Sequence, residues 1–243
     1  MKTEPGDGAV FKTTLWTQVL EAANPHARSD SAAFAQLYLA YWYPLYAFAR
    51  RRGLSPPEAE DIIQDFFTHL VSQQSFADLQ REGGKFRSFL LRSLENFLTT
   101  EWRREQAQKR GGGQRPLSLN AEDGEARFAL DAPDAETPES AFEKRWAFTL
   151  LEHVTDRLRD EYATMNKSEL YVRLGGYLQP DRSGVPYSTV AAQWGMSEGA
   201  VKVAVHRMRQ RYGELLRQAI ACTVSSPAEV DEELRYLISV VGR

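Results

Sequence analysis

The chain has 243 residues and a formal net charge of −3 at pH 7, and 42% of its residues are hydrophobic. This length and apolar content predict one large or two small folded domains and exclude global disorder. Its single cysteine, Cys222, excludes an intrachain disulfide and a cysteine-built zinc site, and no apolar run approaches the roughly 20 residues of a membrane span.

The charges are unevenly distributed along the chain. Lys85–Arg115 holds eight Lys and Arg against three Glu, a net charge of +5, whereas Pro116–Arg145 holds eight acids against three bases, a net charge of −5. Glu198–Arg217 is basic again, with five Lys and Arg against two Glu. Two basic segments separated by an acidic one indicate two surfaces that face a polyanion, joined by a linker that does not bind it.

Helical periodicity dominates the first half, and no alternating strand pattern is convincing. The pattern predicts a short helix over 11–22 and a longer aromatic-rich helix over 31–52 that ends at Gly53. Ser55-Pro56-Pro57-Glu58 is typical of a capping box and predicts a helix that runs to about Ser72. A basic helix is predicted over 86–108, and the Gly111-Gly112-Gly113 run after it is expected to stop the helix.

Residues 111–139 contain four Gly, three Pro and many acids, which predicts a linker. Helical patterns return over 140–162 and 168–178, and a loop with Pro180, Gly184 and Pro186 precedes two short helices. The spacing of Ala191, Gly195 and Val201 is typical of a helix-turn-helix, in which a small residue lies at the helix contact and a glycine takes the turn conformation.

In this motif Ser197 can cap the second helix, and Val201, Val205 and Met208 face inward. Lys202, His206 and Arg209 share the outer face, with Val203 and Arg207 beside it. Short and basic side chains on such a helix suit a DNA major groove and its phosphates. An ordinary helical hairpin with a solvated basic side is the alternative.

The stretch PYSTVAAQWGMSEGAVKVAVHRMRQRYGELL resembles the C-terminal DNA-binding region of bacterial RNA polymerase sigma factors of the extracytoplasmic-function (ECF) group. The resemblance implies that this helix reads the −35 promoter element. The candidate −35 residues are Glu198, Lys202, Val203, His206, Arg207 and Arg209.

AEDIIQDFFTHL, residues 59–70, is amphipathic, with an apolar side and an acidic and amide side. It resembles the sigma region that docks on the clamp helices of the largest polymerase subunit. The resemblance implies a polymerase contact by Asp61, Gln64, Asp65 and Thr68. A solvated acidic face is the alternative.

FRSFLLRSLENFLTTEWRREQAQKRGGG resembles the neighbouring sigma region, which opens DNA at the −10 element. DNA melting requires phosphate neutralisation and rings that hold unstacked bases. Several rings must be core residues, and spacing favours Phe97 as one of them. The candidate −10 residues are Phe86, Arg87, Phe89, Arg92, Asn96, Trp102, Arg103 and Arg104.

A last helix is predicted to begin at Ser226-Pro227-Ala228-Glu229, a second capping-box pattern. Val230, Leu234, Leu237, Ile238 and Val241 form one predicted apolar stripe. A helix of this length is marginal alone in water, so the stripe must pack on something. One interpretation is that it completes the C-terminal domain; the other is that it is a regulatory element touching the N-terminal domain or a partner.

These patterns predict an all-α protein of two helical domains joined by a flexible acidic linker. The predicted parts are a sigma region 2-like bundle over 1–110, the linker over 111–138, a region 4-like helix-turn-helix domain over 139–222 and a C-terminal helical extension over 223–243. We expect a cytoplasmic protein that is not an enzyme, has no cofactor and has no metal site, because the four His lie far apart and no catalytic motif is present.

The expected partners are core RNA polymerase and promoter DNA, both double-stranded and melted, and no membrane. An anti-sigma factor or another regulatory protein is a further candidate partner. Two alternatives stay open: a helix-turn-helix repressor or activator without sigma activity, and an adaptor that binds polymerase only.

Overall fold

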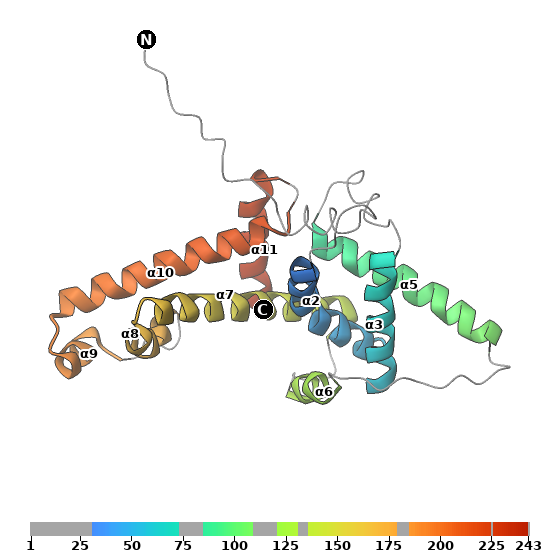
Figure 1. The fold of residues 1–243 in the computed structure, drawn as a ribbon, viewed down its shortest axis with the longest axis horizontal. Helices are drawn as coiled ribbons and strands as arrows, with labels where there is room; N and C mark the ends of the chain where they lie inside the picture. Colours follow the sequence, from blue (N-terminus) through green and yellow to red (C-terminus); the bar gives the residue numbers. More distant parts are fainter. Residues whose placement is uncertain are drawn as a thin grey trace, which may run out of the picture. The chain divides into compact units, whose positions relative to one another are not determined.

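The structure, a computed structural model, describes residues 31–72, 85–108, 121–130, 136–178, 185–224 and 226–242. Within these ranges all regular secondary structure is helical, which confirms the all-α class (Figure 1). The helices are α2 Ser31–Arg51, α3 Pro56–Ser72, α5 Phe86–Gln108, α6 Ala121–Leu130, α7 Pro138–Thr164, α8 Ser168–Leu174, the 3₁₀ helix η1 Gly175–Leu178, α9 Tyr187–Trp194, α10 Glu198–Ala221 and α11 Ala228–Val241. The helix predicted over 11–22 lies outside the described residues. No helix in the described ranges is long and apolar enough to cross a membrane.

The chain divides into two compact units. Unit 1 consists of residues 1–149 and 221–243, and unit 2 consists of residues 150–220. The tail after residue 220 therefore belongs with the N-terminal unit, and the regulatory role of the last helix stays a prediction. The chain passes from one unit to the other twice, within α7 and within α10, whereas the sequence suggested a single connecting linker.

The core of unit 1 begins with the α2–α3 pair. Tyr46 and Phe48 of α2 are fully buried, and Gly53 ends the helix region with a φ of 93°, a conformation that glycine adopts readily. The predicted capping box forms at the start of α3, where the Ser55 N–H donates to Glu58 Oε2 at 2.9 Å. The predicted apolar side of α3 is buried; it comprises Ala59, Ile63, Phe66, Phe67 and Leu70.

Part of the predicted linker is a docked helix. Residues 121–130 form α6, which lies beside α2 and α3 (Figure 1). Gly124 is buried against the Trp42 ring, and the Glu125 carboxylate binds Arg50 and Tyr46. The prediction of a flexible linker is wrong for this stretch because Gly124, Glu125 and Phe128 make specific contacts with α2. The rest of 111–135 lies outside the described residues.

Unit 2 has its own apolar core, built from the second half of α7 together with α8, η1, α9 and α10. Leu158, Leu174 and Leu215 are among its fully buried members, and Val201, Val205 and Met208 face it from α10 as predicted. The Arg211 guanidinium joins α10 to α7 by two hydrogen bonds of 2.8 Å to the Glu161 carboxylate. The helix after the turn, predicted to be short, extends for 24 residues.

The α11 helix differs from its prediction in the side that it buries. Its N-cap residue is Pro227, which makes no side-chain capping hydrogen bond. Its buried residues are Glu233, Leu237 and Val240, whereas Ile238 is 68% exposed. The inward face is thus rotated from the predicted apolar stripe, because two cations of unit 1 bind the buried Glu233 carboxylate.

Candidate functional site

The outer side of α3 presents the polar residues singled out in the sequence. Gln64, Asp65 and Thr68 are exposed and Asp61 is half-buried, on the side opposite the buried apolar residues. The Thr68 hydroxyl donates to the Gln64 carbonyl at 2.9 Å, a bond within the helix that leaves the face polar. The structure therefore brings these four residues together on one helix side, as an interface with a protein partner requires.

The first two residues of α5 are buried in this structure. Phe86 is 3% exposed and Arg87 is 6% exposed. The Arg87 Nε donates to Glu233 at 2.5 Å, and its Nη1 donates to Glu143 at 3.2 Å. In this arrangement the Phe86 ring packs against Tyr41 and the Arg87 guanidinium is paired with Glu233 of α11, so the DNA contacts expected of these two residues stay predictions.

Farther along α5, Arg92 and Asn96 are exposed and Phe89 is half-buried. The Phe97 ring packs against the buried Phe66 ring with 5.7 Å between ring centroids, but Phe97 itself is half-buried, so it lies at the edge of the core rather than within it. The side chains of Trp102, Arg103 and Arg104 lie outside the described residues, although the helix backbone continues through them to Gln108.

The α9–α10 pair has the local geometry that its spacing predicts. Gly195 adopts φ 63° and ψ 27°, the left-handed conformation expected at the turn, and its neighbours Ala191 and Val201 are buried. The Ser197 hydroxyl accepts a hydrogen bond from the Ala200 N–H at 3.2 Å, as an N-cap does. These contacts explain why α10 begins at Glu198.

All six residues predicted to contact the −35 element are exposed on α10: Glu198, Lys202, Val203, His206, Arg207 and Arg209. Two of the cations have partners within the chain. Lys202 Nζ lies 2.7 Å from Glu198, which raises the pKa of Lys202, and Arg209 Nε donates to the Tyr177 carbonyl at 2.9 Å. The Val203 side chain, 50% exposed, is an apolar group on this basic face.

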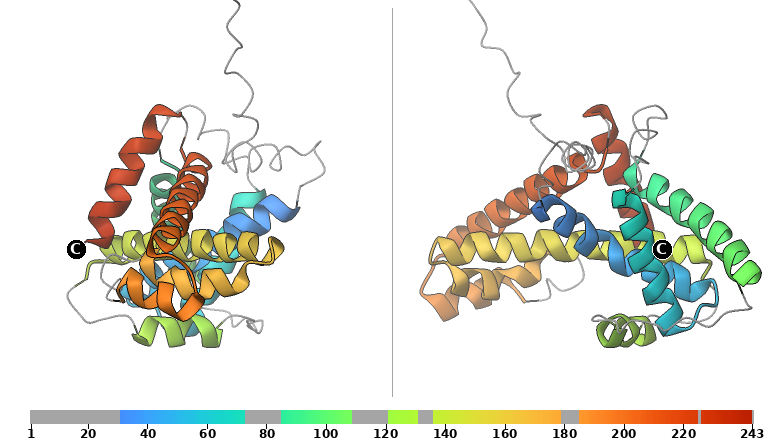
Figure 2. Two further views of the ribbon diagram at one scale, coloured as in Figure 1. Left: turned by 90° about the vertical axis from the view of Figure 1, so that its left-hand side faces the viewer. Right: turned by 45° about the vertical axis from the view of Figure 1, so that its right-hand side comes forward.

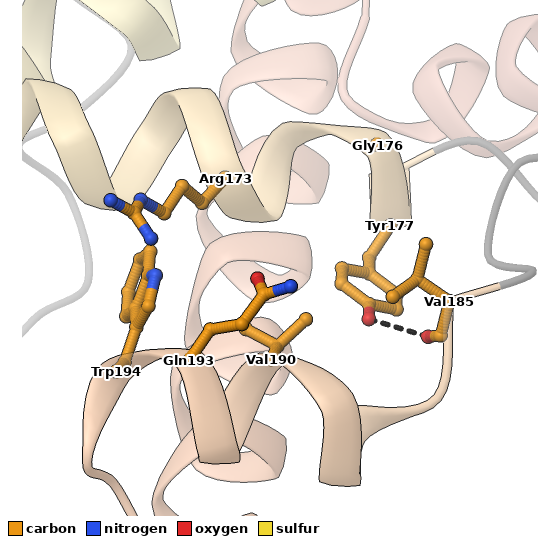
Figure 3. A pocket seen from close by; sticks show the side chains of 7 residues that line it. All are labelled: Arg173, Gly176, Tyr177, Val185, Val190, Gln193 and Trp194. Carbon is orange, nitrogen blue, oxygen red and sulfur yellow. Dashed lines mark hydrogen bonds between the residues drawn. The ribbon is translucent and has the colours of Figure 1, made fainter.

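Unit 2 also contains a pocket of about 340 Å³ that the sequence did not indicate (Figure 3). The Arg173 guanidinium lies over the Trp194 ring at one end, and the Tyr177 hydroxyl donates to the Val185 carbonyl at 2.6 Å at the other. The lining residues are Arg173, Gly176, Tyr177, Val185, Val190, Gln193 and Trp194. No group of His, Cys, Asp and Glu in the described part of the chain could hold a metal ion.

Sequence reasoning also missed the contacts of Lys85 with α11. Lys85 Nζ lies 2.9 Å from Glu232 and 3.0 Å from Glu233. The only signal in the sequence was the complementary charge of the two segments, basic from Lys85 onward and acidic over 229–233. Charge alone does not specify which distant segments pair.

The comparison with protein families matches residues 37–108 to the model described as Sigma-70 region 2. The matched residues include most of α2 and all of α3 and α5, and therefore both candidate surfaces of unit 1. No curated protein and no solved structure matches the chain. Residues 37–108 are accordingly similar to a sigma-70 region 2.

Proposed function

We propose that the chain is a sigma factor of the ECF group, which recruits core RNA polymerase to a specific set of promoters and initiates their transcription. The observation that carries this proposal is the region 2 match over 37–108, on helices whose outer faces carry acidic and basic side chains. Unit 1 binds the polymerase and the −10 element, and unit 2 binds the −35 element.

The polymerase contact is assigned to the outer side of α3. Asp61, Gln64, Asp65 and Thr68 supply two carboxylates, an amide and a hydroxyl, and three of the four are exposed. Acidic and amide groups on one helix side suit a complementary basic face on a partner and speed their encounter. The buried face of the same helix is held rigidly by the core, so the contact surface is preorganised.

The −10 contact is assigned to the outer side of α5 beyond its first turn. Arg92 can neutralise a phosphate, and the Asn96 amide can donate to and accept from a base edge. We add Phe89, Trp102, Arg103 and Arg104 from the sequence pattern, because rings and cations together hold an opened strand.

The −35 contact is assigned to α10 as the recognition helix of a helix-turn-helix, with α9 as the first helix. The left-handed Gly195 and the Ser197 cap support this assignment. In a major groove, Lys202, His206 and Arg207 supply donors to phosphates and base edges, while Val203 supplies an apolar contact suited to a thymine methyl group. Arg209, held by the Tyr177 carbonyl, and Glu198, which orients Lys202, complete the face.

The chemistry of RNA synthesis belongs to the polymerase in this account. The chain supplies binding and positioning and contributes no catalytic group, cofactor or metal site of its own. It acts with core polymerase and DNA in the cytoplasm, and an anti-sigma factor or another regulatory protein is a further proposed partner.

Binding measurements separate this function from its two rivals. The sigma factor retains promoter DNA in a complex only when core polymerase is present and binds core polymerase without DNA. A repressor or activator instead binds its DNA site tightly without polymerase, and an adaptor binds polymerase without adding any promoter preference. Gel-shift assays with purified core polymerase, the chain, or both reveal which pattern holds.

A further inference from the structure

The first turn of α5 and the first turns of α11 are joined by a cluster of ion pairs within unit 1. Lys85 Nζ contacts Glu232 and Glu233 at 2.9 and 3.0 Å, and Arg87 Nε contacts Glu233 at 2.5 Å. The backbone adds a contact beside them, since the Phe86 N–H donates to the Thr223 carbonyl at 3.2 Å. The two helices lie close together in Figure 2.

Aromatic rings enclose the two cations. The Arg87 guanidinium lies 4.0 Å from the Tyr236 ring centroid and 5.1 Å from that of Trp146, and Lys85 lies 5.4 Å from Tyr236. Burial lowers the pKa of Arg87, but the hydrogen bond to Glu233 together with the charges of Glu233, Tyr236 and Glu143 outweighs burial and leaves the pKa raised. The Arg87 guanidinium is thus a buried cation held by a carboxylate and two rings, while Lys85 beside it is partly exposed.

Cations beside flat rings are what single-stranded DNA requires, because the cations bind phosphates and the rings stack on bases. The α11 helix supplies matching groups from the opposite side. Two adjacent carboxylates, Glu232 and Glu233, occupy the cations as phosphates would, and the Tyr236 ring stacks on Arg87 as a base would.

We propose that Lys85, Arg87 and Trp146 form a single-stranded DNA site on unit 1, and that α11 is a displaceable shield that occupies it by mimicking DNA. The proposal rests on the proposed function, because it extends the −10 surface of α5 to that helix's buried first turn. In the shielded state the first turn is closed to DNA; when α11 leaves, it becomes continuous with Arg92 and Asn96.

The contacts of α11 suit a helix that can be displaced. Glu232 is 65% exposed and Ile238 is 68% exposed, so two of its side chains lie largely in solvent. Its buried face includes a charged residue, Glu233. A buried ion pair contributes little net stability because the desolvation of both charges offsets their attraction.

The test uses the full chain and a fluorescein-labelled oligodeoxythymidylate, with affinity measured over a range of salt concentrations. Replacing both carboxylates (Glu232→Gln with Glu233→Gln) should tighten binding roughly tenfold, equivalent to about 1.4 kcal/mol. The plot of log affinity against log salt should steepen by about 1.4, since each phosphate neutralised on a single strand adds about 0.7.

A charge-matched control on the same helix, Glu229→Gln with Asp231→Asn, removes two charges but leaves the Lys85 and Arg87 ion pairs in place. It should leave both the affinity and the salt slope near those of the wild type. Adding Arg87→Gln to the variant that carries Glu232→Gln and Glu233→Gln should remove most of its gain in affinity for the oligonucleotide. Circular dichroism and thermal unfolding of every variant check the fold.

The proposal is overturned if the double variant folds and binds the oligonucleotide no better than the control. If loss of the buried Glu233 carboxylate unfolds the chain, the single variant Glu232→Gln, at an exposed position, is used as the test instead. Its plot of log affinity against log salt should steepen by about 0.7. An unchanged slope in that variant means that α11 is a permanent structural element.

Core-polymerase affinity of the wild type, measured in parallel, separates this outcome from failure of the proposed function. If the wild type binds core polymerase but the double variant has no higher affinity for the oligonucleotide, only the proposal that α11 shields a DNA site is wrong. If the wild type does not bind core polymerase at all, the proposed function fails, whatever the oligonucleotide shows.

Discussion

Arg50 and Glu125 form a two-pronged ion pair although 75 residues separate them in the chain. Arg50 Nε donates to Glu125 Oε2 at 3.0 Å and Nη2 donates to Oε1 at 2.9 Å, while the Tyr46 hydroxyl donates to Oε2 at 2.8 Å. The hydrogen bond from Arg50 is the main reason that the pKa of Glu125 is lowered. This group of three fixes the position of α6 on α2 within unit 1.

The close approach of α6 to α2 depends on a glycine. A Cβ atom at Gly124 would lie 2.7 Å from Trp42 Cη2, and the Trp42 ring is itself stacked on Tyr46. Gly124→Val should therefore overpack this contact and lower the free energy of unfolding by about 1–3 kcal/mol, measured by urea denaturation. It should also expose residues 121–130 to proteolysis.

The control for that variant is another helical glycine with free space around it. No atom lies within 4 Å of a Cβ built on Gly213 in α10. Gly213→Ala should stabilise unit 2 by about 0.5–1 kcal/mol, since alanine loses less backbone entropy than glycine on helix formation. Equal stability of the Gly124→Val variant and the wild type would mean that α6 is not held against Trp42.

The Glu161–Arg211 pair makes the stability of unit 2 sensitive to acid. The hydrogen bond from Arg211 lowers the pKa of Glu161 from its ordinary value of 4.5. A carboxyl group whose pKa is lowered on folding stabilises the fold above its unfolded pKa, and this stabilisation disappears as the pH falls through the lowered value. Unfolding of unit 2 should therefore become easier below about pH 4.5.

Glu161→Gln should flatten this part of the pH profile and leave the chain less stable at neutral pH. Because Arg211 is 37% and Glu161 is 27% exposed, solvent screening limits the expected cost to about 1 kcal/mol. Thermal unfolding of the wild type and the variant between acidic and neutral pH measures both effects. Parallel profiles would show that the pair does not carry the acid sensitivity.

The α3 face should be required for polymerase binding. Asp61→Lys together with Asp65→Lys reverses two charges on that face and should abolish measurable affinity for core polymerase. Circular dichroism should stay unchanged, because neither residue belongs to the buried side of the helix. A matched double reversal on α7, Asp156→Lys with Asp160→Lys, should retain affinity; undiminished binding by the α3 variant would contradict the docking surface.

The two DNA surfaces should fail in different ways. Lys202→Ala with His206→Ala should change the preference among −35 sequences, each lost base contact costing about 1–3 kcal/mol. Arg103→Ala with Arg104→Ala should slow DNA opening at every promoter, because phosphate contacts carry little sequence information. A panel of mutated promoters and permanganate footprinting distinguish these defects, and identical profiles would contradict the division of labour.

Features set by neighbouring residues were predictable from the sequence. The apolar side of α3 follows from helical spacing, and the left-handed Gly195 with the Ser197 cap follows from the local requirements of a tight turn. The exposed face of α10 could be predicted for the same reason, because burial of Val201 and Val205 determines which residues point outward.

Features set by distant partners were not predictable. The sequence marks Glu233 as one of several acids near a helix start, and only the cations Lys85 and Arg87 explain its burial. The same holds for α6. Its glycine and acidic residues are typical of a linker, and only their contacts with Arg50 and Trp42 explain why this stretch is a docked helix. Spacing within one segment carries no information about such tertiary contacts.

Run-off transcription tests the central claim most directly. Purified core polymerase is incubated with a library of genomic promoters, with and without the chain, and the transcripts are sequenced. The sigma-factor account predicts transcripts that require the chain, start at a limited set of promoters and share −35 and −10 elements. No new transcripts, or fewer transcripts from promoters that another sigma factor already serves, would contradict it.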